Sequence, residues 1–161
     1  MLQELADGKI LAGAADGIAR IVVNNPEKRN AVSLAMWEAV AGALAGFAGD
    51  PSLRVLIVSG AGGRAFVSGA DISRFEQERT GEDAVARYNI AAEAAYASLA
   101  AFPRPVIAAI DGACVGGGLA LAVACDIRLA AEDSRFGLPA ARLGLGEAAG
   151  ADVHLDRGQQ Q

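Results

Sequence analysis

Three consecutive glycines at positions 116–118 are the residues of this sequence best placed to do chemistry with the backbone. They follow a short apolar run, Val106–Ile110, and a turn at Asp111 and Gly112. A second apolar run of good helix formers, residues 119–125, comes after them. The pattern predicts a buried strand, a glycine turn and a buried helix.

The start of such a helix can bind negative charge. The first N–H groups of a helix have no partner inside the helix, and they lie at the positive end of its dipole. Glycines there let a ligand approach the backbone without meeting a Cβ. The junction could hold an anion, or an oxygen that becomes anionic during a reaction. Alternatively, the glycines only allow the strand and helix to pack closely, but three in a row favour a functional junction.

A second stretch of interest is AFVSGADI, residues 65–72. An apolar segment meets Gly69, and the residues from Ala70 onward are expected to begin a helix. Asp71 would place a negative charge in its first turn, where the dipole favours one. Taken alone, the stretch is better explained as an ordinary loop with a helix start.

A third pattern indicates a different class of protein. Residues 60–65 fit G-x-G-x-x-A after a predicted strand, as in a dinucleotide-binding fingerprint. That fingerprint requires a helix to begin at the glycines, and residues 66–69 are poor helix sequence. The match is weak for that reason, and a nucleotide-binding oxidoreductase is kept only as a competing hypothesis.

The composition excludes several function classes. The chain has 161 residues, 53% of them hydrophobic, a mean hydropathy of +0.30, a net charge of −5 and a pI near 4.8. No basic stripe indicates nucleic acid, and no apolar run reaches the roughly 20 residues of a membrane span. The N-terminus lacks the apolar segment of a signal peptide, so we expect a cytoplasmic protein. The apolar surplus predicts an oligomer, or a chain that lacks part of its cover.

Histidine and cysteine chemistry is also disfavoured. The only histidine, His154, lies near a polar end, which argues against a histidine metal site or a Ser-His triad. Cys114 and Cys125 lie in apolar sequence and are interpreted as small buried hydrophobic residues.

The remaining sequence supplies the elements that must position these stretches. Alternating strands and helices predict an α/β domain with largely parallel strands. Ser33 is the expected N-cap of the first helix. We expect a core over residues 1–146 and a poorly ordered polar tail over 147–161. The expected strands are 9–15 and 17–24 as a hairpin, 53–59, 106–110 and 127–130; the expected helices are 34–49, 82–102 and 119–125. The expected buried helix positions are Leu34, Trp37, Val40, Leu44 and Phe47, then Val85, Tyr88, Ala92, Ala95 and Leu99.

Three stretches together carry a family resemblance. They are NNPEKRNAVS near the start, AFVSGADI, and VIAAIDGACVGGGLALAVACDIRLAAEDSRFGLPAARLGLG. In this combination the sequence resembles the enoyl-CoA hydratase/isomerase (crotonase) superfamily from about Ile18 to Gly146. The resemblance implies a spiral of ββα units, an acyl-CoA thioester as ligand, and a homotrimer or dimer of trimers. Coenzyme A would enter as part of the substrate, with no other cofactor and no metal. Members of the family continue well beyond Gly146, and a truncated or frame-shifted chain is one explanation of the difference.

The resemblance also assigns residues. Two backbone N–H groups, those of Ala70 and Gly117, would grip the thioester oxygen as it becomes an enolate. The coenzyme A nucleotide would lie against Lys28, Arg29 and Ala31. It would also contact the loop formed by Ala65, Val67, Ser68, Gly69, Asp71 and Ile72.

The sequence departs from the family where protons are moved. Hydratases of the family carry two glutamates at positions that here are Ala120 and Ala140. General acid–base help is typically worth about 10²–10⁴-fold, so water addition should be impaired. The resemblance still implies an enzyme of this family, a lyase or isomerase, that binds acyl-CoA and stabilises a thioester enolate. One alternative is a malonyl-type acyl-CoA decarboxylase, whose loss of CO₂ creates the enolate without a base. Another is a catalytically impaired acyl-CoA-binding pseudoenzyme. Glu147 is a possible substitute base.

Overall fold

The computed structural model describes residues 1–71, 73 and 81–138, and within them the chain forms two β-sheets and three α-helices. The larger sheet has the strand order β1-β2-β3-β4-β6-β8 and the smaller one the order β5-β7-β9. The larger sheet contains β1 (Gln3–Leu5), β2 (Ile10–Ala15), β3 (Ile18–Val23), β4 (Val55–Gly60), β6 (Val106–Ile110) and β8 (Ile127–Ala130). The smaller contains β5 (Ala65–Val67), β7 (Ala113–Val115) and β9 (Arg135–Gly137).

The larger sheet begins antiparallel and continues parallel. β2 and β3 form the expected hairpin, and the turn residues Asp16 and Gly17 both have positive φ, as tight hairpin turns require. From β3 onward, β4, β6 and β8 each add in parallel. Parallel neighbours need a crossover connection. The crossover from β3 to β4 is helical, whereas those from β4 to β6 and from β6 to β8 pass first through a strand of the smaller sheet.

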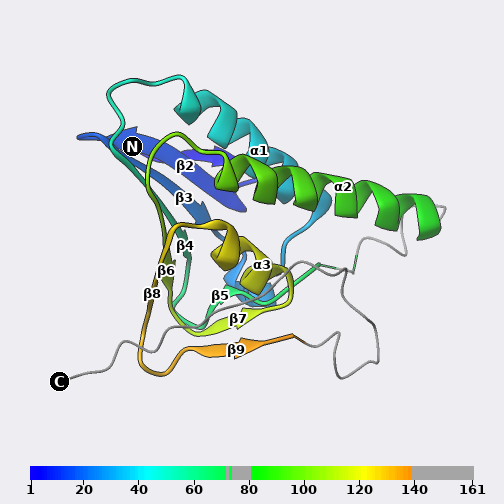
Figure 1. Cartoon of the computed structure of the whole chain (residues 1–161). Helices are drawn as coiled ribbons and strands as arrows, with labels where there is room; N and C mark the ends of the chain where they lie inside the picture. The colour runs from blue at the N-terminus through cyan, green and yellow to red at the C-terminus, as the bar shows by residue number, and fades with distance from the viewer. Residues whose placement is uncertain (72, 74–80, 139–161) are drawn as a thin grey trace.

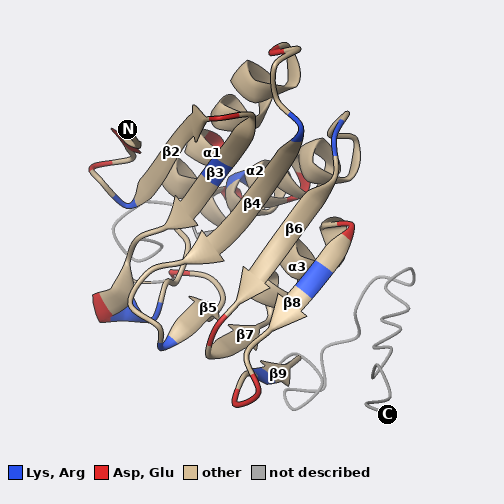
Figure 2. Cartoon of the chain, turned by 90° about the vertical axis from the view of Figure 1, so that its left-hand side faces the viewer, with Lys and Arg blue, Asp and Glu red and all other residues tan. Residues whose placement is uncertain are grey.

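The α/β class and the ββα repeat expected from the resemblance are confirmed. β4 and β5 are followed by α2 (Gly81–Ala100), and β6 and β7 by α3 (Gly117–Ala124). β8 and β9 begin the same pattern again. Each unit therefore adds one strand to each sheet. With α1 (Leu34–Ala48), the helices cover one face of the larger sheet (Figures 1 and 2).

The first helix begins and ends as expected. The Ser33 hydroxyl accepts a hydrogen bond from the Met36 N–H, and the Met36 sulfur accepts one from the Ser33 N–H. Gly49 is the C-cap. The buried face contains Trp37, Val40 and Leu44, together with Met36, which the spacing argument missed. Leu34 and Phe47, which were expected to be buried, lie near the two ends of the helix and are only half-buried.

In α2 the expected face is right except at its first position. Tyr88, Ala92, Ala95 and Leu99 are buried, but Val85 is 43% exposed. Ala84 takes its place at 1% exposed. Residues three or four positions apart can share a helix face. Here Ala84, four residues before Tyr88, lies on the buried face, whereas Val85, three residues before it, lies on the side toward solvent.

The core lies between the helices and the larger sheet. Alternate residues of the central strands point into it, including Leu56 and Val58 of β4 and Val106 and Ala108 of β6. Each large side chain buried there contributes about 1.5–3 kcal/mol. Both cysteines are buried and free, as expected, and burial raises the pKa of each thiol to about 12.

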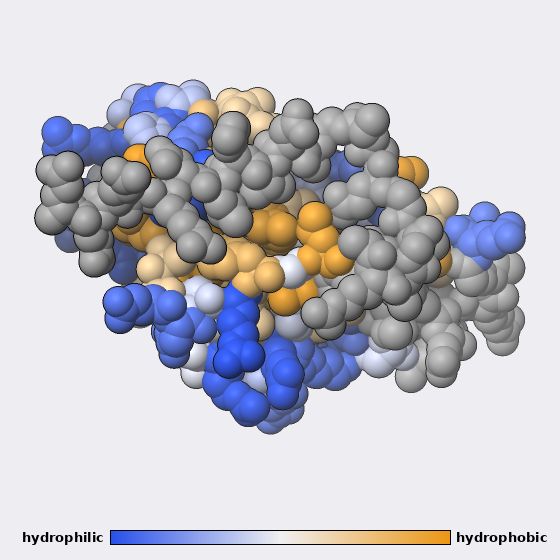
Figure 3. Space-filling model, turned by 60° about the horizontal axis from the view of Figure 1, so that its bottom comes forward, coloured by the Kyte–Doolittle hydropathy of each residue, from blue (hydrophilic) through white to orange (hydrophobic). Residues whose placement is uncertain are grey.

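Two features of the strands were not predicted. The short strands β1, β5, β7 and β9 were not foreseen from the residues, because three residues cannot display a two-residue period. The strand at 127–130 exists but is exposed, since β8 is the edge of the larger sheet. Ile127 and Leu129 are 47% and 60% exposed. The lower face of the molecule, where β9 lies, shows an apolar area beside hydrophilic surface (Figure 3).

Some expectations fall outside the described residues. Most of the charged segment 76–83 does so, as do the domain boundary at 146, the tail and His154. In the part of the chain that is described, none of the helices has the length and apolar character needed to cross a membrane.

Candidate functional site

The two stretches singled out in the sequence meet at a pair of glycines. Gly69 follows β5 with φ of +121°, and Gly116 follows β7 with φ of +55°. A Cβ built on Gly116 would lie 4.0 Å from the Gly69 Cα, and one built on Gly69 would lie 3.9 Å from the Val115 carbonyl oxygen. The parallel pairing of β5 with β7 brings these glycines side by side.

The peptide after Gly69 presents an N–H to the outside. The Gly69 carbonyl accepts a hydrogen bond from the Val32 N–H, and the Asp71 N–H donates to the Val32 carbonyl, both at 2.9 Å. In a trans peptide the C=O and the following N–H point in opposite directions. The N–H of Ala70 therefore points away from Val32. Ala70 is exposed, and its N–H has no acceptor within the described residues.

The peptide after Gly116 behaves in the same way. The Gly116 carbonyl accepts hydrogen bonds from the N–H groups of Leu119 and Ala120, so it points along α3. The N–H of Gly117, the first residue of α3, consequently points out of the helix N-terminus. It also lacks an acceptor among the residues that the structure describes.

The three glycines serve three different purposes. Gly116 adopts a backbone conformation that L side chains rarely reach. A Cβ on Gly118 would come within 2.1 Å of the Val67 carbonyl oxygen, so this glycine permits close packing of α3 on β5. A Cβ on Gly117 would lie 3.0 Å from the Tyr96 hydroxyl. The close-packing interpretation therefore applies to Gly118, and the functional junction stays a prediction for the other two positions.

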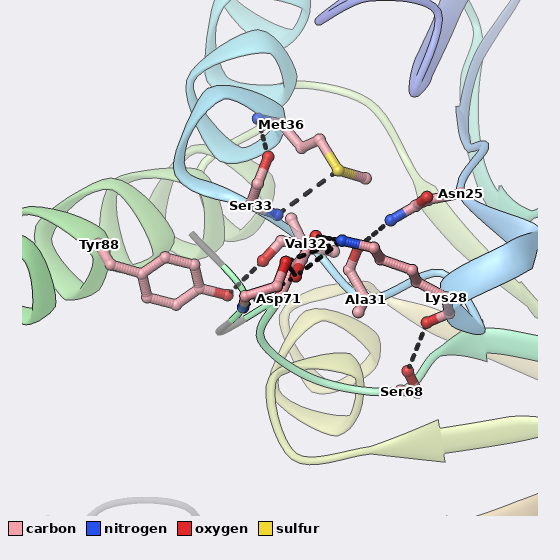
Figure 4. Close-up of polar contacts among 10 residues, drawn as sticks. Asn25, Lys28, Ala31, Val32, Ser33, Met36, Ser68, Asp71 and Tyr88 are labelled. Carbon is pink, nitrogen blue, oxygen red and sulfur yellow. Dashed lines mark hydrogen bonds and ion pairs between the residues drawn. The ribbon is translucent and has the colours of Figure 1, made fainter. Parts of the chain in front are cut away.

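Lys28 is engaged with the loop that carries Ala70. Its ammonium lies 3.1 Å from an Asp71 carboxylate oxygen (Figure 4). It also donates a hydrogen bond of 2.8 Å to the Ser73 hydroxyl. Burial of Asp71 would raise the pKa of its carboxyl, but hydrogen bonds from Ser73 and Lys28 outweigh burial and lower it. Asp71 also accepts a hydrogen bond from the Ser73 N–H.

Two asparagines that the sequence argument passed over organise the loop before Val32. Asn30 is fully buried with φ of +57°. Its amide donates to the carbonyls of Ala61 and Ala65, and its oxygen accepts from the Asn25 N–H. The Asn25 amide donates to the Ala31 carbonyl. The signal available in the sequence was the residue type, since asparagine tolerates left-handed backbone and bonds to nearby peptides.

Two tyrosines of α2 contact the backbone around both glycine corners. The Tyr88 hydroxyl donates to the Val32 carbonyl at 2.9 Å, and the Tyr96 hydroxyl donates to the Gly117 carbonyl at 3.3 Å. Trp37 of α1 packs edge-to-face on Tyr96, with ring centroids 5.2 Å apart. Burial raises the pKa of both tyrosines. The Trp37 indole N–H is near enough to Tyr88 to offset part of that rise, although it completes no well-aligned hydrogen bond with a described residue.

The other residues assigned by resemblance are distributed around the same loops. Arg29 is exposed, with φ of +50°. Ser68 is half-buried and its hydroxyl donates to the Lys28 carbonyl at 3.5 Å (Figure 4). Ala65 and Val67 are buried in β5, and Ala31 is half-buried. Ala120 is exposed on α3. Ile72, Ala140 and Glu147 lie outside the described residues.

The dinucleotide-binding hypothesis does not fit this geometry. After β4 ends at Gly60 the chain turns and enters β5 at Ala65, where the fingerprint requires a helix. Within the described ranges, no group of three or more His, Cys, Asp or Glu side chains could hold a metal ion.

Comparison with known proteins identifies the family. The family model for enoyl-CoA hydratase/isomerase matches residues 13–158. The chain belongs to the enoyl-CoA hydratase/isomerase family. A mitochondrial enoyl-CoA hydratase domain-containing protein 2 from Bos taurus is 40% identical over 147 residues, which are 91% of this chain and 49% of that protein. A crotonyl-CoA hydratase from Syntrophomonas wolfei is 31% identical over 95% of this chain and 58% of its own length.

Solved structures of the family have the same fold. A structure described as a putative enoyl-CoA hydratase/isomerase family protein from Hyphomonas neptunium superposes with a TM-score of 0.80 at 41% identity. The match covers 88% of this chain and 54% of that one. An enoyl-CoA hydratase/carnithine racemase from Magnetospirillum magneticum gives a TM-score of 0.79 at 40% identity, covering 87% and 52%. The chain spans about half the length of the relatives it matches.

Proposed function

We propose that this chain binds acyl-CoA thioesters and stabilises their enolate with the N–H groups of Ala70 and Gly117. The observation that supports the proposal is the matched pair of peptide groups. In each, the carbonyl of the preceding glycine is tied into the protein, the following N–H points outward, and the two glycines adjoin. Proteins named as crotonyl-CoA and enoyl-CoA hydratases among the relatives supply the substrate class.

Such donors act on charge that develops during the reaction. A thioester oxygen carries little charge in the ground state and a full negative charge in the enolate. Fixed N–H groups therefore stabilise the enolate more than the substrate. One donor of this kind is worth about 2.7–4 kcal/mol, or about 10²–10³-fold in kcat, in other enzymes. Backbone donors do not depend on side-chain identity.

The coenzyme A nucleotide is proposed to lie along the loop from Lys28 to Ala31 and the segment from Ala65 to Ile72. Arg29 is exposed there and makes no ion pair within the described residues, so its guanidinium suits a phosphate. Lys28 is 45% exposed but already paired with Asp71. The Lys28 ammonium would therefore bind a phosphate while it stays paired with the Asp71 carboxylate.

The proposed reaction is one that does not need a glutamate at position 120. Ala120 lies one turn after Gly117 and can neither give nor take a proton. Decarboxylation of a malonyl-type thioester breaks the bond between the α-carbon and the carboxylate, and the electron pair left behind forms the enolate. Hydration of an enoyl thioester should be slow. The second candidate function is acyl-CoA binding without turnover, and Ala120 favours it for the same reason.

The decisive experiment removes one donor. Gly117→Pro deletes the N–H, and proline is well tolerated at the first position of a helix. Gly117→Ala is the matched control, because it adds the Cβ near Tyr96 while keeping the N–H. We expect turnover of methylmalonyl-CoA to fall about 10²–10³-fold further in Gly117→Pro than in Gly117→Ala.

The outcomes separate the candidates. Equal turnover in the two variants would contradict the role of the Gly117 N–H. Binding of acetoacetyl-CoA by the unaltered chain, with no turnover of crotonyl-CoA or methylmalonyl-CoA, would favour the binder. Binding of NAD in place of acetoacetyl-CoA would contradict acyl-CoA recognition altogether.

The assembly is proposed to be a homotrimer or a dimer of trimers. The support is the exposed apolar side chains on β8 and near β9, including Phe136 and Leu138, which a partner copy would cover. Light scattering coupled to size-exclusion chromatography tests this proposal. A monomer at micromolar concentration would contradict it.

A further inference from the structure

The two tyrosines of α2 each contact the backbone behind one of the outward N–H groups. The Tyr88 hydroxyl donates to the Val32 carbonyl, which also accepts the Asp71 N–H. The Val32 N–H donates to the Gly69 carbonyl, so Val32 holds the chain on both sides of Ala70. The Tyr96 hydroxyl donates to the carbonyl of Gly117 itself. Tyr88 and Tyr96 are the only tyrosines in the sequence.

The rings around these hydroxyls leave little freedom. Tyr88 is 8% exposed and Trp37 is 1% exposed. Trp37 packs on Tyr96 with an interplanar angle of 78°, and its ring lies 3.7 Å from where a Gly117 Cβ would be. Eight residues of helix separate the tyrosines, which corresponds to about 12 Å along the axis of α2. One rigid helix therefore contacts both glycine corners through fixed aromatic side chains.

We propose that Tyr88 and Tyr96 are positioning residues that set the spacing and direction of the Ala70 and Gly117 N–H groups. The inference rests on the proposed function of those N–H groups. Neither hydroxyl reaches the substrate in this role. Tyr88 acts through Val32 on the segment that carries Ala70, and Tyr96 acts through the Gly117 carbonyl on the first turn of α3. Donors that are misplaced by a fraction of an ångström stabilise an enolate less well.

The test measures polarisation of the bound thioester, which requires no turnover. Cinnamoyl-CoA absorbs at longer wavelength when its thioester carbonyl accepts strong hydrogen bonds. Tyr96→Phe removes the hydroxyl but keeps the ring on Trp37, and Tyr88→Phe does the same at the other corner. We expect each variant to lose at least half of the red shift seen with the unaltered chain, while the Kd changes less than threefold.

A matched control lies on the same helix. The exposed Ser98 hydroxyl donates to the Ala94 carbonyl, so Ser98→Ala removes one hydroxyl–carbonyl bond of α2 away from both corners. We expect its red shift to equal that of the unaltered chain. A full red shift in both tyrosine variants, or an equal loss in Ser98→Ala, would overturn the positioning role. Absence of any red shift in the unaltered chain, or a full shift in Gly117→Pro, would instead overturn the proposed function on which it rests.

A second measurement follows both tyrosines in the unaltered chain by NMR and uses a substitution only to assign the signals. Biosynthetic incorporation of 3-fluorotyrosine labels only Tyr88 and Tyr96, and Tyr88→Phe assigns the two ¹⁹F resonances. Saturation with acetoacetyl-CoA should move the Tyr96 resonance, because its hydroxyl bonds to the residue whose N–H receives the thioester oxygen. A bound complex in which neither resonance moves would contradict the proposal.

Discussion

The two corners that carry the outward N–H groups are built by different physical means. The Ala70 corner is held by polar contacts: a short parallel bridge to Val32, the Lys28–Asp71 ion pair and the buried amide of Asn30. The Gly117 corner is held by close packing, with α3 pressed against β5 at Gly118. A polar corner is sensitive to lost partners and to pH, whereas a packed corner is sensitive to added atoms. This difference predicts how each should fail.

The largest effect is expected from adding one methyl group to the packed corner. In Gly118→Ala the new Cβ would meet the Val67 carbonyl oxygen, a backbone atom that can move only if β5 moves. We expect a loss of more than about 3 kcal/mol in the free energy of unfolding. Urea denaturation followed by circular dichroism measures it.

The control for that variant is a glycine with free space. Gly42→Ala lies on the exposed side of α1, with nothing within 4 Å of the new Cβ. It should stabilise the chain by about 0.5–1 kcal/mol because alanine is the better helix former. Similar stability in Gly118→Ala and Gly42→Ala would contradict the packed-corner description.

The next effect concerns the polar corner. Asn30→Ala leaves the Asn25 N–H and the carbonyls of Ala61 and Ala65 without their partner, and it keeps a left-handed backbone that alanine disfavours. We expect a loss of about 2–3 kcal/mol. Asn30→Gly removes the same hydrogen bonds but relieves the backbone, so it should lose less. If Asn30→Gly is less stable than Asn30→Ala, the left-handed backbone at position 30 does not contribute to the loss as described.

The smallest effect is pH-dependent. The pKa of Asp71 is lower in the folded chain than its ordinary value of 3.8. Its contribution to stability is therefore fully present above about pH 4 and is lost as the pH falls through the lower folded value. Asp71→Asn should lose about 1–2 kcal/mol at pH 7, and the gap to the unaltered chain should narrow below about pH 4.

Denaturation curves at pH 7, 4 and 3 measure that gap. Lys28→Met is the comparison, because it removes the ammonium while the Ser73 hydrogen bonds to Asp71 remain. It should cost less than Asp71→Asn at pH 7. A gap that stays constant over this range would show that Asp71 is not held by its charge.

Long periodic segments were predicted correctly from the sequence. The hairpin of β2 and β3, the Ser33 cap and the central positions of the inner faces of α1 and α2 followed from local patterns that act within a few residues. The short strands were missed because three residues carry no period. Lys28 was interpreted as a phosphate contact, and its pairing with Asp71, 43 positions away, could not be seen.

The sequence by itself determined which peptides could serve as donors. Gly69 and the glycines at 116–118 fix local backbone conformation, and conformation is a property of neighbouring residues. Only the tertiary structure decided that the two corners adjoin, because the pairing of β5 with β7 joins segments more than 40 residues apart. The placement of Tyr88 and Tyr96 behind those corners was decided in the same way, by the packing of α2 on α1 and α3. Such contacts depend on how separate elements pack, which no local pattern encodes.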